Sequence, residues 1–349
     1  MSQEPPSSSS PPPPEASKRR KKRQALIEGC RSVEEFERLD RIDEGSYGVV
    51  YRARDKVSRD IVALKRVKLP REACLEGFPI TALRETNVLL ALQHENIIRV
   101  HEMVVGREHD RVFVVMDYFE HDLKTCIEKQ EGPFSQADAK SLVRQLVAGV
   151  SHMHSKWFIH RDIKTSNLLY SRGRLALCDF GLARRFGDPV LPYTRNVVTL
   201  WYRAPELLLG ATTYSTELDA WSCGCVFAEI FQKAPLFQAK TEIAQLSEIF
   251  KVLGIPTEER WPGYQKLPFA KNLAWKKGQF RRNRLRDLLP AVTFASTTPL
   301  SDSGFEMLGS LLALDPARRG APDPAHPYFA ESPLPSPPHL MPRFPLDRI

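Results

Sequence analysis

The sequence predicts an α+β fold with two lobes, a small β-rich N-lobe that contains one main helix and a larger α-rich C-lobe. Between residues 36 and 68, short β-type runs such as Val49–Tyr51 and Ile61–Leu64 alternate with glycines and charged turns, which is typical of antiparallel strands. Beyond Phe119 the apolar residues recur at helical spacing instead. A β-rich segment followed by an α-rich segment favours two packed lobes.

The two ends of the chain differ in composition from its body. Serines 7–10, prolines 11–14 and the basic run 18–23 lie near the N-terminus, and such a segment cannot bury enough apolar area to fold. We therefore expect a disordered tail over 1–31, the N-lobe over 32–118, the C-lobe over 119–330 and a proline-rich tail over 331–349.

The charge is unevenly distributed. The net charge is +8, and the basic run 18–23 supplies six of these charges, so the rest of the chain is close to neutral. A compact basic run in a disordered segment favours a nuclear-import signal, with an ordinary solvated charge run as the alternative. We predict a nuclear protein, with the cytoplasm as a second location. A nucleic-acid-binding protein is a rival hypothesis, but no RNA-recognition motif is present and the folded body is nearly neutral.

One helix is predicted among the N-lobe strands. Pro79 suits the first turn of a helix. The apolar residues of this segment are Ile80, Leu83, Val88, Leu89 and Leu92. Residues 112–116 are then predicted to form another buried strand.

The C-lobe pattern is helical. Ser135 with Asp138 resembles a capping box, and the helix that follows has its apolar face at Leu142, Val143, Leu146, Val147, Val150 and Met153. A second strongly apolar helix is predicted over 219–232, and the C-terminal tail has apolar residues that can pack on the body. No apolar stretch approaches the roughly 20 residues of a membrane span. The six cysteines have no CxxC spacing, which predicts reduced thiols in an intracellular protein.

Two short motifs carry the chemistry of phosphoryl transfer, which needs metal ligands, a cation and a carboxylate that faces the attacking hydroxyl. The run HRDIKTSN contains Asp162, Lys164 and Asn167, and Asp179 begins the triplet DFG downstream. Asp162 would accept the proton of a substrate hydroxyl, and Lys164 would balance charge on the phosphoryl group. Asn167 and Asp179 supply the hard oxygen ligands that Mg²⁺ prefers.

The N-lobe adds a cation and a glycine loop. Lys65 ends the strand motif VALK, where it can reach phosphates, and Glu85 on the predicted helix is its expected ion-pair partner. Gly45 and Gly48 would let the backbone approach phosphate. A phosphate-covering loop usually has the pattern G-x-G-x-x-G, and Asp43 stands at the position of its first glycine. The negative charge of Asp43 disfavours a triphosphate unless its side chain points away. The predicted phosphate-covering loop consists of Ile42, Asp43, Glu44, Gly45, Ser46, Tyr47, Gly48, Val49 and Val50.

Two further features test this interpretation independently, because their residues lie apart from the main motifs. Glu206, in the triplet APE, is expected to form an ion pair with Arg319 and so anchor the loop on the substrate side. Asp219 begins the second apolar helix, and its carboxylate is expected to accept hydrogen bonds from the backbone of the catalytic loop. Both serve architecture more than chemistry.

Together these motifs resemble the protein kinase family, and within it the cyclin-dependent branch, over roughly residues 32–345. The heptapeptide 79–85, PITALRE, resembles the PITSLRE signature, although the same letters occur in a transcription-elongation relative. An acidic residue at Asp43, the lead-in RSVEEF and the tail segment YFAESPLP favour the PITSLRE type. The resemblance implies a bilobal protein kinase fold, ATP and Mg²⁺ as cofactors, and transfer of the γ-phosphate to Ser or Thr in transcription, pre-mRNA splicing or cell-cycle control.

The resemblance also implies regulation. A cyclin, of the L type, would bind the helix that begins at Pro79, and Thr194 would be the activating phosphosite. The basic residues that would hold its phosphate are Arg84, Arg161 and Arg184. Ser46 and Tyr47 match positions that are phosphorylated to inhibit relatives.

Substrate and nucleotide contacts follow from the same resemblance. The apolar slot for adenine would consist of Ile42, Val50, Ala63, Met116 and Leu169, with backbone hydrogen bonds at Asp117 and Phe119 and a ribose contact at Asp122. A pocket that favours proline after the phosphorylated residue would consist of Val197, Val198 and Arg203.

Two alternatives stay open within this reading. One is a PISSLRE-type cyclin-dependent kinase, which pairs with a different cyclin. The other is a catalytically impaired, cyclin-binding scaffold, which Asp43 and the unusual stretch after Arg319 favour. The scaffold would need a broken catalytic set, and the set that contains Lys65, Glu85 and Asp162 is complete.

Overall fold

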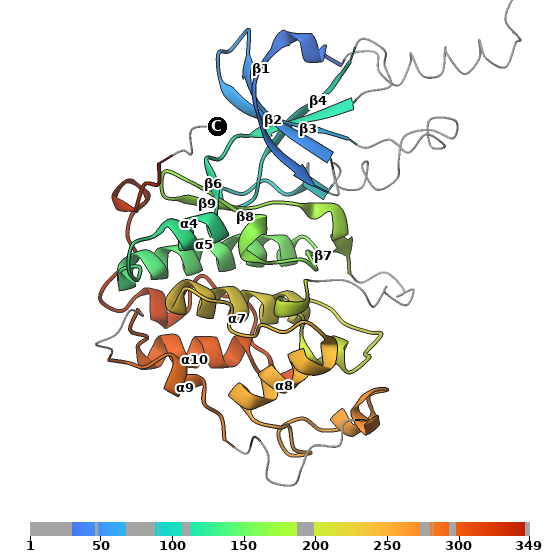
Figure 1. Cartoon of the computed structure of the whole chain (residues 1–349), viewed down its shortest axis with the longest axis vertical. Coiled ribbons are helices and arrows are strands. Elements are labelled where there is room, and N and C mark those ends of the chain that lie inside the picture. The colour runs from blue at the N-terminus through green and yellow to red at the C-terminus, as the bar shows by residue number, and fades with distance from the viewer. Residues whose placement is uncertain are drawn as a thin grey trace, which may run out of the picture. The chain divides into compact units, whose positions relative to one another are not determined.

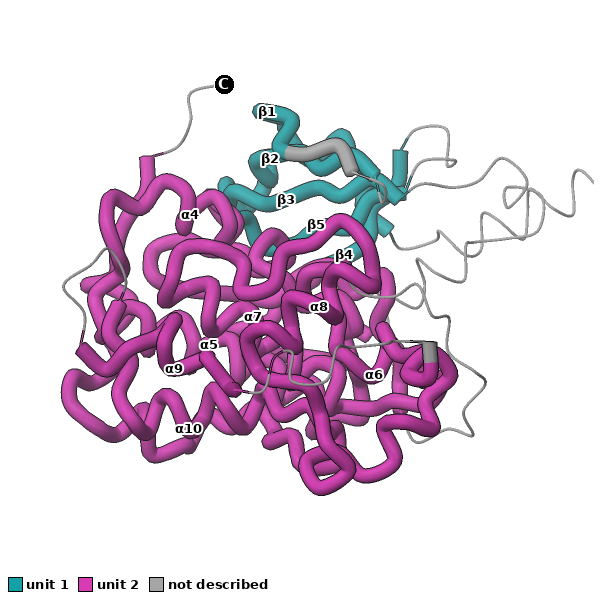
Figure 2. Tube along the Cα trace, turned by 60° about the horizontal axis from the view of Figure 1, so that its bottom comes forward, with its two compact units in different colours: residues 1–79, 101–118 teal, residues 80–100, 119–349 magenta. Residues whose placement is uncertain are grey.

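A computed structural model describes residues 30–45, 48–67, 88–89, 91–106, 112–186, 199–272, 280, 282–292 and 298–345 (Figure 1). The chain divides into two compact units. Unit 1 comprises residues 1–79 and 101–118, and unit 2 comprises residues 80–100 and 119–349 (Figure 2). The predicted domain limits stay predictions.

Unit 1 is built on a five-stranded sheet in the order β1-β2-β3-β5-β4. Its strands are β1 (Phe36–Gly45), β2 (Gly48–Asp55), β3 (Ile61–Arg66), β4 (Val100–Val105) and β5 (Val112–Asp117). Neighbours pair antiparallel from β1 to β2, to β3 and to β5, as the alternating sequence predicts. Because side chains alternate along a strand, the burial of Val62 and Leu64 in the core of this unit leaves Ala63 and Lys65 on the opposite face of the sheet.

The lead-in to β1 is anchored by one arginine. The Arg31 guanidinium donates hydrogen bonds to Glu35, Asp55 and Glu102, and it lies 4.8 Å from the ring centre of Phe36. The hydrogen bonds from Arg31 lower the pKa of Asp55 to about 2. These contacts join three separate segments of the sheet, so residues 31–36 belong to the folded body.

Unit 2 is mainly helical. Its helices are α4 (Leu123–Lys129), α5 (Gln136–Ser155), α6 (Pro205–Leu208), α7 (Glu217–Gln232), α8 (Glu242–Leu253), α9 (Leu285–Leu288) and α10 (Asp302–Leu311). Ser135 caps α5 by accepting a hydrogen bond from the backbone N–H of Asp138, which confirms the predicted start. Helix α7 is buried on every side from Leu218 to Phe231, as expected for a helix that is apolar all round.

Short strands and turns connect these helices. Strands β6 (His121–Asp122), β8 (Leu168–Ser171) and β9 (Arg174–Leu177) form one sheet, and β7 (Phe158–Ile159) pairs with β10 (Arg184–Arg185). The single-turn 3₁₀ helices are Val33–Glu35, Thr165–Asn167, Phe180–Leu182, Leu200–Tyr202, Tyr264–Lys266, Ala270–Asn272, Pro316–Arg318, Pro327–Phe329 and Pro338–Leu340.

The C-terminal tail packs along unit 2. The fully buried Lys140 of α5 donates hydrogen bonds to the carbonyls of Glu331 and Pro333. Met341 is buried, and Phe344 packs edge-on against two rings, His121 and Tyr170. The expectation that the tail can pack is therefore confirmed, but Leu334 and Leu340, two of its apolar residues, remain exposed.

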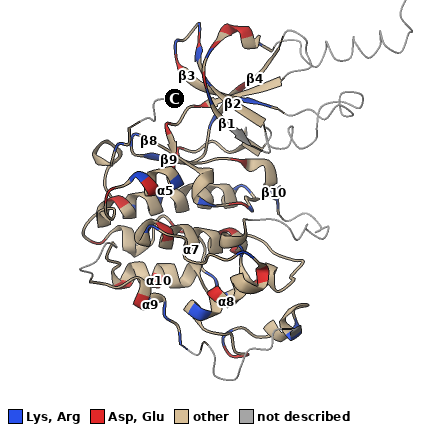
Figure 3. Cartoon of the chain, in the orientation of Figure 1, with Lys and Arg blue, Asp and Glu red and all other residues tan. Residues whose placement is uncertain are grey.

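Several predictions fall outside the described residues. Residues 88, 89 and 91 are helical and Leu92 is buried, but residues 79–87 and the basic run 18–23 are not described. The five described cysteines are free of disulfides. Every helix in the described ranges is too short or too polar to cross a bilayer. In the view of Figure 3, acidic and basic residues are interspersed over both units and do not gather by sign.

Candidate active site

The catalytic loop is the run HRDIKTSN at residues 160–167, and helix α7 holds it in place. Asp219, in the first turn of α7, is fully buried, and its carboxylate accepts hydrogen bonds from the backbone N–H groups of His160 (2.8 Å) and Arg161 (2.9 Å). His154 donates to the same carboxylate at 2.9 Å. Burial by itself raises the pKa of Asp219, but these hydrogen bonds outweigh it, so the pKa lies below its ordinary value. The predicted role of Asp219 is confirmed.

Arg161 has a strained backbone. Its φ is +69°, in the left-handed region that side chains other than glycine rarely adopt. The two adjacent backbone hydrogen bonds to Asp219 hold this conformation. The Arg161 guanidinium donates to the carbonyl of Leu182 at 2.7 Å and to the hydroxyl of Tyr214 at 3.0 Å. The left-handed turn thereby presents the next residue, Asp162.

Asp162 is the centre of the site. Its Oδ2 accepts hydrogen bonds from Lys164 Nζ (2.7 Å) and Asn167 Nδ2 (3.0 Å). Its Oδ1 accepts from the backbone N–H and the hydroxyl of Thr199, both at 3.1 Å. Lys164 also donates to the Thr199 hydroxyl at 3.1 Å. The structure therefore brings together three predicted residues and adds Thr199, to which the sequence analysis assigned no role.

His160 connects this loop to the DFG triplet. Its Nδ1 accepts a hydrogen bond from the backbone N–H of Asp162 at 3.2 Å, so its Nε2 carries the proton and donates to the carbonyl of Cys178 at 3.0 Å. Cys178 in turn donates its N–H to the carbonyl of Asn167 at 3.0 Å. Phe180 packs edge-on against the His160 ring, with the centres 4.9 Å apart. The hydrogen bond between Cys178 and Asn167 thus pairs the residue just before Asp179 with Asn167.

The donor atoms at Asn167 and Asp179 fit a hard divalent cation. Asn167 uses its amide nitrogen for two hydrogen bonds to Asp162, to the carbonyl at 2.8 Å and to Oδ2 at 3.0 Å. Its amide oxygen is therefore oriented away from Asp162. One amide oxygen and one carboxylate are ligands that suit Mg²⁺, which takes its other ligands from water and phosphates.

A buried polar cluster supports the catalytic loop and was missed by the sequence reasoning. Glu229 of α7 accepts hydrogen bonds from the hydroxyls of Thr165 (3.1 Å) and Tyr202 (2.8 Å). Burial raises the pKa of Glu229 above its ordinary value. The cluster joins the loop to the segment that contains Thr199. The available signal was Glu229 itself, an acidic residue inside the otherwise apolar stretch 223–231.

A second anchor holds the segment that follows Thr199. Arg319 and Glu206 form a buried bidentate ion pair at 2.7 and 2.9 Å, and the Arg319 guanidinium lies 5.1 Å from the ring centre of Trp221. The predicted pairing of these two residues is confirmed. The unusual residue after Arg319 also has a reason, because a Cβ on Gly320 would lie 2.0 Å from the hydroxyl of Ser310.

The nucleotide residues predicted in unit 1 lie on four neighbouring strands, β1, β2, β3 and β5. Val50 is opposite Lys65 in the ladder, and Ala63 is opposite Met116. The side chains of residues 43–45, and residues 46 and 47 entirely, lie outside the described part of the chain. A Cβ on Gly48 would lie 2.1 Å from the Arg66 carbonyl oxygen, so the fold of this hairpin itself requires glycine there.

The nucleotide residues predicted in unit 2 are Phe119, Asp122 and Leu169. Phe119 is buried, and Leu169 is opposite Asp122 in the β6–β8 ladder. Asp122 caps α4, because its two carboxylate oxygens accept from the N–H (2.9 Å) and the hydroxyl (2.8 Å) of Thr125. The ribose contact of Asp122 stays a prediction beside this structural role.

The predicted regulatory residues are only partly described. Glu85, Arg84, Thr194, Val197 and Val198 lie outside the described residues. Arg203 forms an ion pair with Glu242, and Arg184 lies on β10. The phosphothreonine cluster and the proline pocket therefore stay predictions.

Comparison with known proteins defines the class. A family model for the protein kinase domain matches residues 36–329, so the chain belongs to the protein kinase family. This membership implies the use of ATP and a divalent metal. The chain is similar to cyclin-dependent kinase G-2 of Oryza sativa subsp. japonica, with 53% identity over 323 residues, which cover 92% of this chain and 45% of the relative.

Two animal relatives give the same picture. Cyclin-dependent kinase 11B of Rattus norvegicus is 49% identical over 91% of this chain and 71% of its own length. The serine/threonine-protein kinase PITSLRE of Drosophila melanogaster is 51% identical over 91% of this chain and 34% of its own length. The resemblance to PITSLRE-type cyclin-dependent kinases is confirmed. The chain spans about half the length of the rice relatives that it matches.

Proposed function

We propose that this chain is an active cyclin-dependent protein kinase that transfers the γ-phosphate of ATP to serine and threonine hydroxyls. The observation that carries the proposal is the orientation of the Asp162 carboxylate by Lys164, Asn167 and Thr199. A non-catalytic scaffold has no need to hold a carboxylate and an ammonium group in this arrangement. Membership of the protein kinase family supports the same conclusion.

The residues divide the chemistry between them. Asp162 orients the substrate hydroxyl and accepts its proton as the oxygen attacks. Lys164, which binds the same carboxylate at 2.7 Å, offsets the charge that builds on the transferring group. Mg²⁺, held by Asn167 and Asp179 when bound, would neutralise phosphate charge. Asp219 and Glu229 act on structure, because they hold the loop that carries Asp162.

The direct test is Asp162→Asn in cyclin-bound protein. The substitution keeps the shape of the side chain and removes the proton acceptor, so phosphate transfer to a Ser-Pro peptide should fall by about 10²–10⁴-fold. Asp323→Asn, at an exposed turn, is the matched control and should leave the rate unchanged. Equal rates for wild type and Asp162→Asn would end the proposal.

The finer parts of the proposal concern regulation. The relatives are named cyclin-dependent kinases, which supports a cyclin partner, and we assign it to the L type bound at the helix that begins at Pro79. Phosphorylation of Thr194, proline-directed substrates, and a nuclear role in transcription, splicing or the cell cycle complete the proposal. Copurification with an L-type cyclin tests the partner, since the PISSLRE-type alternative pairs with a different cyclin.

The impaired scaffold is separated from the enzyme by nucleotide binding. We expect Mg-ATP to raise the unfolding temperature of the wild type and not of Lys65→Met, because a bound ligand stabilises the folded state. An unfolding temperature of the wild type that Mg-ATP leaves unchanged would favour the scaffold.

A further inference from the structure

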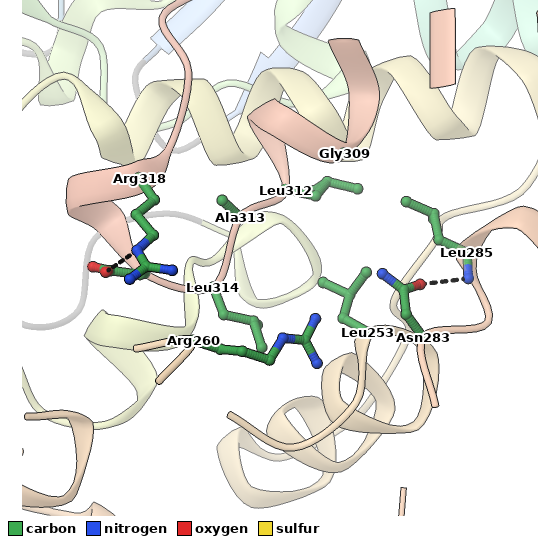
Figure 4. Close-up of a pocket in the computed structure, with 10 residues that line it drawn as sticks. Leu253, Arg260, Asn283, Leu285, Gly309, Leu312, Ala313, Leu314 and Arg318 are labelled. Carbon is green, nitrogen blue, oxygen red and sulfur yellow. Dashed lines mark hydrogen bonds and ion pairs between the residues drawn. The ribbon is translucent and has the colours of Figure 1, made fainter. Parts of the chain in front are cut away.

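Unit 2 contains a pocket on which the proposed chemistry makes no demand. It has a volume of about 220 Å³ and lies between the end of α8, the segment before α9, and the end of α10 with the loop that follows (Figure 4). Its apolar lining residues are Leu253, Leu285, Leu312, Ala313 and Leu314. None of the residues that line it belongs to the candidate active site, so it needs a separate explanation.

The polar groups of this pocket are mainly donors. Arg260 is exposed and forms no ion pair with a described residue. The amide oxygen of Asn283 accepts a hydrogen bond from the N–H of Leu285 at 2.9 Å (Figure 4). The oxygen is therefore directed toward the backbone of Leu285, and the N–H groups of the amide are left for a ligand. Arg318 is 59% exposed at its side chain and has a loose contact of 3.5 Å with Asp315, the one carboxylate among the lining residues.

Asp315, the partner of Arg318, already accepts a hydrogen bond on the carboxylate oxygen that Arg318 does not contact. Asp315 Oδ1 accepts from the N–H of Ala317 at 3.0 Å. The lining therefore contains two guanidinium groups and one amide, but only one carboxylate, which is already engaged. The lining is net positive and rich in donors, so it is complementary to a ligand that carries carboxylates.

A glycine keeps the pocket open. Gly309 lies inside α10, and a Cβ built on it would meet no atom within 4 Å. The other glycine of this helix differs, because a Cβ on Gly304 would lie 2.6 Å from both Leu300 and Tyr328. Glycine destabilises a helix interior relative to alanine. No steric contact with the described residues requires it at 309, and its effect there is to leave room in the pocket.

We infer that this pocket, lined by residues between Leu253 and Arg318, is a docking site for an acidic segment of a partner protein. One apolar side chain of the partner fills the space beside Gly309, and flanking Asp or Glu side chains bind Arg260 and Arg318. A volume of about 220 Å³ is below the roughly 300–1,000 Å³ of small-molecule sites and fits a single anchoring side chain. The inference holds whether or not the chain transfers phosphate.

The charge of the pocket argues against an occupant from this chain's own basic segment. The run 18–23 consists of Lys and Arg and would be repelled by Arg260 and Arg318. A second copy of the chain is the remaining alternative, and the experiment below separates it from an acidic partner.

The test is a titration of the full chain, with labelled leucine methyl groups, followed by NMR. The probe is the capped peptide Asp-Glu-Leu-Glu-Asp, and its comparisons are Asp-Glu-Ala-Glu-Asp and Lys-Lys-Leu-Lys-Lys. We expect the first peptide to shift the methyl signals of Leu312 and Leu314, and to bind about 10-fold more tightly than either comparison peptide. Raising the salt concentration should weaken this binding, because the charged contacts lie at the surface.

Three variants locate the binding. Gly309→Leu fills the pocket and Arg260→Glu reverses its charge, so each should weaken binding of the leucine peptide by about 10-fold. Gly309→Ala adds a single methyl group and should keep the binding. Thermal unfolding of each variant confirms that it is folded, and phosphorylation of a short peptide by Gly309→Leu should stay at the wild-type rate.

Some outcomes would overturn the inference. Equal binding of the acidic and basic peptides would remove the charge argument, and equal binding to wild type and Gly309→Leu would place the peptide elsewhere. Concentration-dependent dimers in sedimentation that Gly309→Leu abolishes would show that the occupant is a second copy of the chain.

Discussion

Around Asp162 the polar side chains bind one another, whereas around the docking pocket the cationic groups face solvent. Asp162 accepts four hydrogen bonds from three residues. Asp219 accepts three more, two of them from the backbone of the two residues that precede Asp162. In the docking pocket, Arg260 and Arg318 are both exposed. A site that must hold one reactive geometry uses its polar groups internally, and a site that must recruit a partner leaves them accessible.

The largest expected effect comes from the most enclosed group. Asp219→Ala leaves two backbone N–H groups and His154 without their acceptor in a fully buried place, and should cost about 3–5 kcal/mol of stability. Phosphate transfer should be lost with it, because Arg161 no longer keeps its left-handed turn. Urea unfolding measures the first effect, and Asp287→Ala at the exposed surface is the control. A loss below 1 kcal/mol would mean that the loop is held by other contacts.

Glu229 should make stability depend on pH. Its folded-state pKa is raised by burial, so the folded state binds the proton more tightly than the unfolded state does. The stabilising contribution is complete below the unfolded pKa of about 4.3 and is lost as pH rises through the folded pKa, at about 1.4 kcal/mol for each unit between the two. We expect Glu229→Gln to flatten the decline of the unfolding temperature with rising pH. Identical slopes for the two proteins would contradict this reading.

Thr199 should affect rate more than stability. Thr199→Val removes the hydroxyl that donates to Asp162 and accepts from Lys164, and keeps the backbone hydrogen bond. The loss of one such bond to a charged group, about 1.5 kcal/mol, corresponds to roughly a 10-fold lower kcat. Thr199→Ser should restore the wild-type kcat. An unchanged kcat in the valine variant would show that Lys164 and Asn167 suffice to orient the carboxylate.

The smallest predicted effect sharpens the comparison at the pocket. Gly309→Ala should stabilise the chain by up to about 1 kcal/mol, because the new methyl group meets open space and alanine is the better helix former. Gly304→Ala in the same helix should destabilise it, since its Cβ would overlap Leu300 and Tyr328. Thermal unfolding of the two variants compares them directly. Destabilisation by Gly309→Ala as well would show that the space beside Gly309 is not available in solution.

The catalytic set was predictable from sequence because it is local. Asp162 and Lys164 lie within five residues of Asn167, so the chain itself brings them together, and only the hairpin of β8 and β9 separates this run from Asp179. Strands β1, β2, β3 and β5 of unit 1 were predicted from local sequence patterns, but β4 was not predicted. Glu206 with Arg319 was a long-range prediction, and it came from the template of phosphoryl-transfer motifs and not from periodicity.

Other contacts could not be predicted from pattern. Gly48 was assigned to phosphate, but the carbonyl of Arg66 on the neighbouring strand already requires a glycine there. Asp122 was assigned to ribose, and both its oxygens cap α4. In both cases a local structural demand was present that the residue type alone did not reveal.

By itself, the sequence determined the division into a β-rich part and an α-rich part, the chemical groups of the catalytic loop and the family to which they belong. Tertiary structure alone decided that Thr199 orients Asp162 and that Glu229 joins the catalytic loop to the segment that contains Thr199. It also decided that Gly309 borders a pocket and is not packed against another side chain. Periodicity and motif spacing report contacts between residues that are near in the chain. Contacts across tens of residues depend on how the helices pack, and that packing carries no repeating signature in the sequence.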